Sequence, residues 1–161
     1  MERVIQDLPH ETIEKLNYIL GETVDISNAD RGTLQIYDPE KDLLLIISHH
    51  GFSDDFLSHF KYVKPFDGSA CGRAAGTGNV VTIYDVSQDT AFTSHLETAV
   101  EAGIRAVKSI PLRNEGRLVG VLSVHYKEVR KCRSGNTLTA AMASDIACSL
   151  NSIIELKARL V

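Results

Sequence analysis

The strongest chemical signal in this sequence is a run of small residues and glycines near its middle. Phe66–Ala74 reads FDGSACGRA and Gly76–Gly78 follows closely, so four glycines fall within eleven residues. Glycine lets the backbone turn sharply and approach another group closely, and a β-branched segment, Val80–Asp85, comes next. The pattern favours one wall of a small-molecule pocket, in a segment too short for an ordinary helix. No nucleophile with a recognisable base accompanies it, so the sequence predicts binding rather than catalysis.

Cys71 carries the most reactive functional group of this run. A position near a short helix N-terminus and close to Arg73 would lower the thiol pKa and favour the thiolate. One interpretation is therefore a redox-responsive thiol. The other, which we prefer, is a small apolar residue packed beneath the segment.

Several histidines also have the chemistry of a binding site. His95 could contact a ligand, a haem iron or an anion, and a solvated helix position fits it equally well. His49 and His50 are adjacent, so an extended strand points them to opposite faces and they do not easily share one metal ion. His125 lies on the same strand side as small polar residues, which either floor a cavity or pack against a helix.

Length and composition indicate one globular domain over residues 1–161, with 43% hydrophobic and 24% charged residues. A domain of this size buries roughly 68–70% of its unfolded surface and needs no disulfide or metal. The net charge of −4 and the lack of a basic stripe disfavour nucleic acid as a partner. There is no apolar run of about 18 residues for a membrane span, and no secretory signal at the start. Three scattered cysteines are typical of the reducing cytoplasm.

Hydrophobic periodicity predicts a long helix near each end of the chain. Apolar residues recur at helical spacing over about 8–27, where proline and acidic residues mark the start, and again over about 137–160. The apolar side chains of the last helix are expected to form core and a dimer seam, or to pack only within the chain.

Between these helices the sequence predicts two β-hairpins and shorter elements, which together indicate an α+β domain with a mainly antiparallel sheet. Asp85 and Arg105 are candidates for a buried ion pair or ligand contacts, or lie at strand ends in water. The expected elements are Gly32–Tyr37, Leu43–Ser48, a short helix capped by Ser53–Asp55, a strand around Val80–Asp85, a helix near Ser94–Ala102, Ile104–Leu112 and Leu118–Lys127.

Six strings in this order resemble the GAF domain family, most strongly the GAF domains of bacterial multi-domain sensor histidine kinases. The matching pieces are Arg31–Asp38, His50–Phe52, Asp67–Ala74, Asp85–Val86 with Phe92, Gly103–Val107 and Gly116–Ser123. The resemblance implies a PAS-like sheet of order 2-1-5-4-3, covering residues about 30–127 together with the pocket. It also implies pocket-forming short helices on one face and terminal helices on the other, commonly paired in a parallel homodimer.

Two features depart from the family pattern. The sequence ends at Val161 without a kinase phosphoacceptor or ATP-binding segment, which indicates an excised input domain or a stand-alone receptor. Lys131–Asn136 also differs from the proline-containing connection that is usual before the last helix.

The ligand signatures of GAF subfamilies fit this sequence poorly. Covalent bilin attachment uses a cysteine beside the histidine, but serine and leucine flank His95. In cyclic-nucleotide GAF domains an aspartate follows the phenylalanine that matches Phe92, where this sequence has leucine, and the Asn-Lys pair is missing too. Free-methionine-sulfoxide reductases of this family use several cysteines, and none occurs here between residues 80 and 122.

Together, the residues and the resemblance predict a non-enzymatic, cytoplasmic sensory domain of bacterial signal transduction. A small polar metabolite or an anion would fill the pocket, and the terminal helices would report to a kinase or another output domain. The sequence indicates neither a cofactor nor a metal site. Two alternatives stay open: a ligand-free dimerisation module, and a cysteine-based reductase like those acting on free methionine sulfoxide. The predicted ligand-binding residues are Phe66, Asp67, Ser69, Cys71, Phe92, His95 and Ser109.

Overall fold

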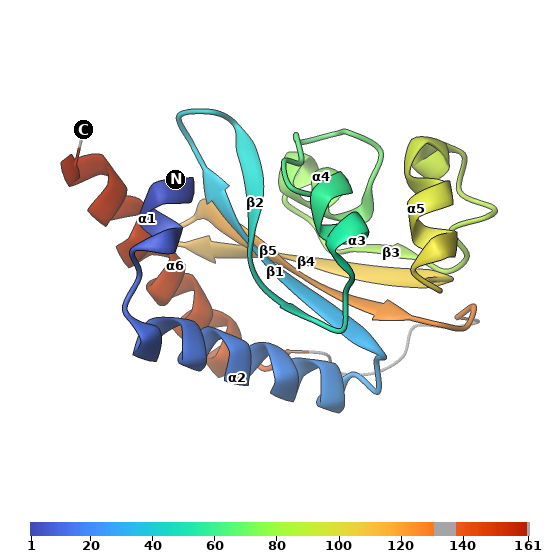
Figure 1. Ribbon diagram of the computed structural model, residues 1–161, viewed down its shortest axis with the longest axis horizontal. Coiled ribbons are helices and arrows are strands. Elements are labelled where there is room, and N and C mark those ends of the chain that lie inside the picture. The colour runs from blue at the N-terminus through green and yellow to red at the C-terminus, as the bar shows by residue number, and fades with distance from the viewer. Residues whose placement is uncertain (131–137, 161) are drawn as a thin grey trace.

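A five-stranded antiparallel sheet forms the centre of the molecule, with helices on both faces (Figure 1). The computed structural model describes residues 1–130 and 138–160. The strand order β2-β1-β5-β4-β3 confirms the predicted α+β class and the 2-1-5-4-3 sheet. The strands are β1 Arg31–Asp38, β2 Leu43–His50, β3 Val81–Ile83, β4 Ala106–Asn114 and β5 Arg117–Tyr126.

The long helices α2 (His10–Ile26) and α6 (Ala140–Leu160) cover one face of this sheet (Figure 1). A short helix that the sequence analysis missed, α1 (Glu2–Gln6), contacts α6. The unusual connection Lys131–Asn136 and the expected helix start at 137 lie outside the described residues. On the other face are α3 Asp54–His59, α4 Ala70–Thr77, the 3₁₀ helix η1 Thr90–His95 and α5 Leu96–Glu101.

Each face of the sheet has its own hydrophobic core, because successive strand residues point to opposite faces. On β1, Leu34 and Ile36 pack with the long helices, whereas Thr33 and Gln35 point toward the short ones. The strand is buried on both faces, and therefore polar side chains become trapped inside the molecule. Within the described residues, no helix is both long and apolar enough to cross a membrane.

The glycine-rich run is an eight-residue helix, α4, and not the segment too short for a helix that the sequence analysis expected. Ser69 caps its start, since the side-chain oxygen accepts a hydrogen bond from the Gly72 N–H at 3.0 Å. Gly78 ends it in the left-handed conformation (φ 68°). A Cβ atom on Gly72 would lie 2.1 Å from Asp67 Oδ1, so this position needs glycine for the close approach.

A buried ion pair joins the last turns of α6 to the end of β1. The Lys157 Nζ atom lies 2.7 Å from Asp38 Oδ1 and 2.5 Å from Glu40 Oε2, and the Asp38 side chain is completely buried. Burial alone would raise the pKa of Asp38, but hydrogen bonds from Lys157 and the Glu40 N–H hold it below its usual value. Asp38 is therefore a buried carboxylate whose main cation comes from α6.

Candidate functional site

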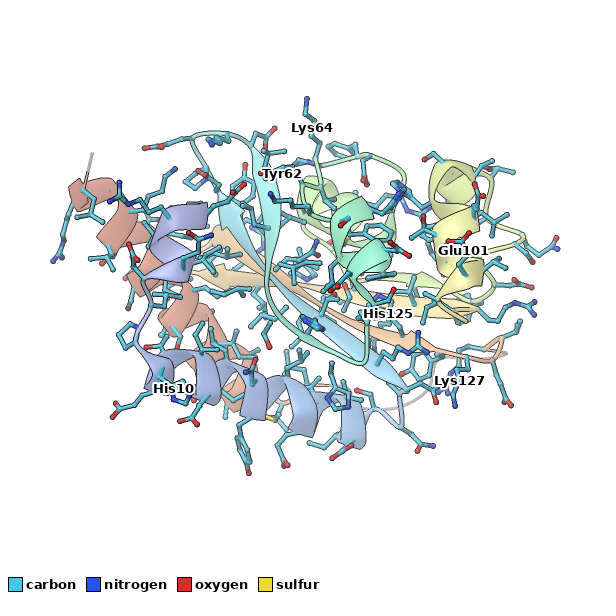
Figure 2. The ribbon with its side chains drawn as sticks, in the orientation of Figure 1. His10, Tyr62, Lys64, Glu101, His125 and Lys127 are labelled. Atoms are coloured by element: carbon cyan, nitrogen blue, oxygen red, sulfur yellow. The ribbon has the colours of Figure 1, made fainter. Side chains whose placement is uncertain are left out.

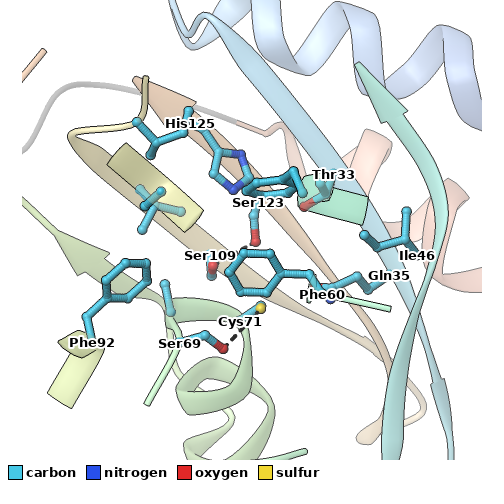
Figure 3. A pocket seen from close by; sticks show the side chains of 15 residues that line it. Thr33, Gln35, Ile46, Phe60, Ser69, Cys71, Phe92, Ser109, Ser123 and His125 are labelled. Carbon is cyan, nitrogen blue, oxygen red and sulfur yellow. Dashed lines mark hydrogen bonds between the residues drawn. The ribbon is translucent and has the colours of Figure 1, made fainter. Parts of the chain in front are cut away.

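A small cavity lies between the sheet and the short helices (Figure 3). Its volume is about 30 Å³, which is room for about one or two water molecules. The wall is mixed, with an aromatic and aliphatic part from the short helices and a polar part mostly from the strands. The lining residues are Thr33, Gln35, Ile46, Phe56, Phe60, Ser69, Ala70, Cys71, Phe92, Ala99, Ile104, Val107, Ser109, Ser123 and His125.

The polar part of the wall is a row of side chains that crosses three adjacent strands. Thr33 on β1 and Ser109 on β4 both pair with Ser123 on β5, so all three residues lie on one face. The hydroxyl oxygens of Ser109 and Ser123 are 2.7 Å apart. The sequence left open whether the strand face that carries His125 lines a cavity or packs against a helix. The register places His125, two residues beyond Ser123, on the cavity face.

Two buried acceptor atoms at this cavity have no hydrogen-bond partner: Gln35 Oε1 and His125 Nδ1. Both side chains are more than nine-tenths buried, with exposed fractions of 1% and 7%. A buried polar atom without a partner costs about 1–3 kcal/mol, and such atoms are rare in native proteins. The unpartnered pair therefore marks a place where a polar guest would be stabilised.

His125 is a neutral imidazole. Burial lowers its pKa to about 3, helped by the nearby positive charge of Arg31 and opposed by a hydrogen bond to the Arg31 main chain. Its ring packs edge-on against Phe52, with centroids 4.9 Å apart. Figure 2 shows it between the sheet and the short helices, whereas the other labelled residues are exposed: His10, Tyr62, Lys64, Glu101 and Lys127.

Cys71 lies in the cavity wall as a thiol, and the less favoured interpretation, a thiol of lowered pKa, is wrong. Burial raises that pKa to about 11, although a hydrogen bond with Ser69, whose Oγ is 3.3 Å from the sulfur, works the other way. Arg73 does not compensate, since its guanidinium forms an ion pair with Asp89 at 3.1 Å. Cys71 therefore fits the interpretation of a small packed residue.

We expect Cys71 to resist alkylation in the folded protein. In a Cys132→Ser background, iodoacetamide at pH 8 should modify Cys71 at least about 100-fold more slowly than the exposed Cys148, because only about one thiol in a thousand is ionised three units below its pKa. Peptide mass spectrometry over time measures both rates, and the unfolded chain, in which the two rates should be similar, is the control. Equal rates in the folded protein would contradict this assignment.

Asp67 and His95 lie at the rim of the cavity and connect the short helices to one another. His95 Nε2 is 3.3 Å from Asp67 Oδ2, and His95 Nδ1 is 2.9 Å from His59 Nε2 on α3. The hydrogen bond to Asp67 raises the pKa of His95, while burial and the His95 charge lower that of His59. The three side chains thus hold α3, η1 and the start of α4 together above the cavity.

The seven predicted binding residues separate into three groups. Ser69, Cys71, Phe92 and Ser109 line the cavity, and Asp67 and His95 form the rim. Phe66 lies outside, because its left-handed backbone (φ 63°) leaves the ring 67% exposed and packed against Gly76.

The sequence analysis did not select Gln35, Thr33 or Phe60 as binding residues. The one available signal was the presence of polar residues at alternate positions of the otherwise apolar β1. The other candidate pair, Asp85 and Arg105, forms a partly exposed ion pair in which Nη2 and Oδ2 are 3.4 Å apart. Neither residue lines the cavity. His49 and His50 are exposed, and the described residues contain no cluster suited to a metal ion.

The structure is an α+β domain with a cavity on one face of its sheet, and comparison of the sequence gives its family. Residues 11–143 match the family model described as "GAF domain". The match covers most of the chain, so this protein belongs to the GAF domain family. No curated protein matches it.

Solved structures share the fold at low sequence identity. A domain assigned to a two-component sensor histidine kinase of Sinorhizobium meliloti 1021 is 19% identical, with a TM-score of 0.65 over 91% of this chain and 95% of that one. The free methionine-R-sulfoxide reductase of Neisseria meningitidis, solved with its substrate, is also 19% identical (TM-score 0.64, 99% and 87% covered). The GAF domain of a phosphoenolpyruvate-protein phosphotransferase from Coxiella burnetii is 16% identical (TM-score 0.67, 96% and 88% covered).

Proposed function

We propose that this GAF domain is a sensory input domain that binds a small molecule in the cavity beneath α4. The observation that carries the proposal is the pair of unpartnered acceptors, Gln35 Oε1 and His125 Nδ1, in the wall of a largely apolar cavity. A guest that pairs with them removes a cost that the empty site bears. Similar domains from a sensor histidine kinase and a phosphotransferase agree with a regulatory role in bacterial signalling.

Strand β1 offers a short physical path from the cavity to the long helices. Gln35 faces the cavity, and Leu34 and Ile36 on the opposite face belong to the core formed with α2 and α6. Three residues beyond Gln35, Asp38 forms the buried ion pair with Lys157 of α6. A ligand shifts the helices only if it binds two of their arrangements differently, and each tenfold difference in affinity is worth about 1.4 kcal/mol.

The partners of the proposed receptor are a second copy of the chain and an output domain such as a kinase. Apolar side chains on the outer surfaces of α2 and α6 support a homodimer through the terminal helices: Tyr18 is 68% exposed and Leu160 is 70% exposed. We place this receptor in the cytoplasm, in keeping with its few cysteines, of which the two in the described residues, Cys71 and Cys148, are free.

The cavity volume favours one alternative, a dimerisation module without a ligand. A space of about 30 Å³ holds water more easily than a metabolite, so a larger guest requires an aromatic side chain such as Phe60 to move. The reductase alternative is weaker than the binding proposal, because the cysteine in the cavity is a buried thiol with a raised pKa.

Native mass spectrometry of the purified protein tests the proposal directly, since one spectrum reports both bound mass and copy number. We expect a small-molecule adduct on a dimer, and its loss in Ser109→Leu, which places extra carbons in the cavity. The matched control is Ser87→Leu at an exposed position, where the adduct should persist. If the unmodified protein carries no adduct and no metabolite of a broad panel raises its melting temperature, the ligand-free module is the better account.

A further inference from the structure

No charged side chain lines the cavity among the described residues. Two cations of neighbouring segments, Arg31 and Arg73, have partners that do not line the cavity. The Arg31 guanidinium donates a hydrogen bond to the Ala102 carbonyl, and Arg73 pairs with Asp89. The nearest anion, Asp67, is paired with His95. With His125 neutral, the wall offers a guest no counter-charge of either sign.

Most polar groups of the wall are already paired with a neighbour. The Gln35 side chain forms a hydrogen bond with Cys71, and the His125 ring is bonded to the Arg31 main chain. The Ser69 hydroxyl donates to Asp67, and the hydroxyls of Ser109 and Ser123 bond to each other. The buried atoms of the wall without a partner are the acceptors Gln35 Oε1 and His125 Nδ1. The hydroxyl of Thr33 also lines the cavity, and the bond between Ser109 and Ser123 uses only one of their two hydroxyl hydrogens, so a guest can pair with donors and acceptors without meeting any charge.

We propose that this cavity selects small uncharged molecules that present N–H or O–H donors to Gln35 and His125 and an apolar part to Phe60 and Phe92. Primary and secondary amides, ureas and small alcohols belong to this class. The inference rests on the proposed function, because it defines the ligand of the same site. It differs from the sequence-based expectation, which also allowed an anion.

Charged molecules are excluded for two physical reasons. Moving an ion from water into a wall without a counter-charge costs far more than moving a neutral polar group. An anion such as acetate would also direct its oxygen lone pairs at two acceptor atoms, so the acceptors would stay unpaired while the anion lost its water. A cation could donate hydrogen bonds to the two acceptor atoms, but the lining contains no carboxylate to balance its charge.

Two pairs of probes separate charge from donor chemistry. Acetamide and acetate have nearly the same shape and differ in charge, and N-methylacetamide and methyl acetate differ mainly in one N–H group. Each is titrated into the unmodified protein while the Gln35 side-chain amide and the His125 ring are followed by NMR. We expect each amide to bind at least about tenfold more tightly than its matched partner.

A variant tests whether Gln35 Oε1 causes the preference for molecules that carry an N–H donor. Gln35→Met keeps the length of the side chain and removes its oxygen, so the preference for N-methylacetamide over methyl acetate should fall to less than about threefold. Gln88→Met, at an exposed position, is the matched control and should keep the full preference. The backbone NMR spectrum reports whether each variant is folded, and the comparison of probes in the unmodified protein does not depend on either variant.

The outcomes distinguish this inference from the proposed function. If acetate binds as tightly as acetamide, or methyl acetate as tightly as N-methylacetamide, the cavity binds small molecules but the ligand class is wrong. If none of the four probes perturbs the cavity resonances at high millimolar concentration, both the ligand class and the binding function are contradicted.

Discussion

Replacing Lys157 with methionine should lower the free energy of unfolding by about 3 kcal/mol, because it leaves the carboxylate of Asp38 buried without its main cation. Lys157 Nζ donates to Asp38 Oδ1 at 2.7 Å, and Asp38 is completely buried. The second oxygen, Oδ2, has no hydrogen-bond partner and lies 3.9 Å from the Met1 ammonium. Chemical denaturation at pH 7 gives the change in stability.

Two further variants identify the cause of that loss. Asp38→Asn combined with Lys157→Met removes both charges and should recover most of the stability. Lys15→Met breaks an ion pair of nearly the same length, 2.8 Å to Asp145, between half-exposed side chains, and should cost less than about 1 kcal/mol. If Lys157→Met costs no more than Lys15→Met, the ion pair does not fasten α6 to the sheet, and the proposed path from cavity to helices loses its last link.

Acidification should destabilise the protein steeply, and His125 should account for much of the slope. In the folded state its pKa is about 3, against 6.5 for the ordinary side chain. Below pH 6.5, His125 therefore binds a proton in the unfolded chain but stays neutral in the folded protein. The contribution of neutral His125 to stability is complete above pH 6.5 and falls by up to about 1.4 kcal/mol per pH unit as the pH drops toward 3. Over the whole window the loss amounts to about 4–5 kcal/mol.

The variant His125→Phe keeps a ring against Phe52 and cannot take up this proton, so its stability should change much less between pH 6.5 and 4. His10→Phe, at an exposed helix position, should keep the steep dependence. The raised pKa of His95 acts above pH 6.5, and the lowered pKa values of Asp38 and Asp67 act mainly below 4. The lowered pKa of His59 acts in the same window as that of His125, but His59 is present in all three proteins, so the difference between their curves reports His125. Parallel curves for His125→Phe and the unmodified protein would show that His125 is not held neutral by burial.

The fold could be predicted because its signals are local. Alternating residues bounded by turns mark the strands of both hairpins, and helical periodicity marks α2 and α6. The residue order of the glycine-rich run identified the wall of the cavity, although its conformation was misjudged. Ser69 caps a regular helix there, and the glycines serve a close approach to the loop at Asp67 as well as a turn.

The binding site could be predicted only in part, since it depends on contacts between residues far apart in the chain. In the sequence, the nearby Arg73 could lower the pKa of the Cys71 thiol. In the structure that guanidinium pairs with Asp89, and burial raises the thiol pKa. Phe66 is adjacent to the pocket helix, yet its left-handed backbone directs the ring outward. Gln35 was hidden within a strand that is buried on both faces.

The sequence by itself determined the order of elements, the α+β class and the family, because each follows from patterns within a few neighbouring residues. Only the tertiary structure decided which polar groups meet inside the molecule. Strand register brings Thr33, Ser123 and Ser109 into one row, and packing against Phe52 and Phe56 closes His125 off from water. Hydrogen bonding and desolvation depend on distances between segments that the chain order does not specify, and these two effects set the chemistry of the cavity.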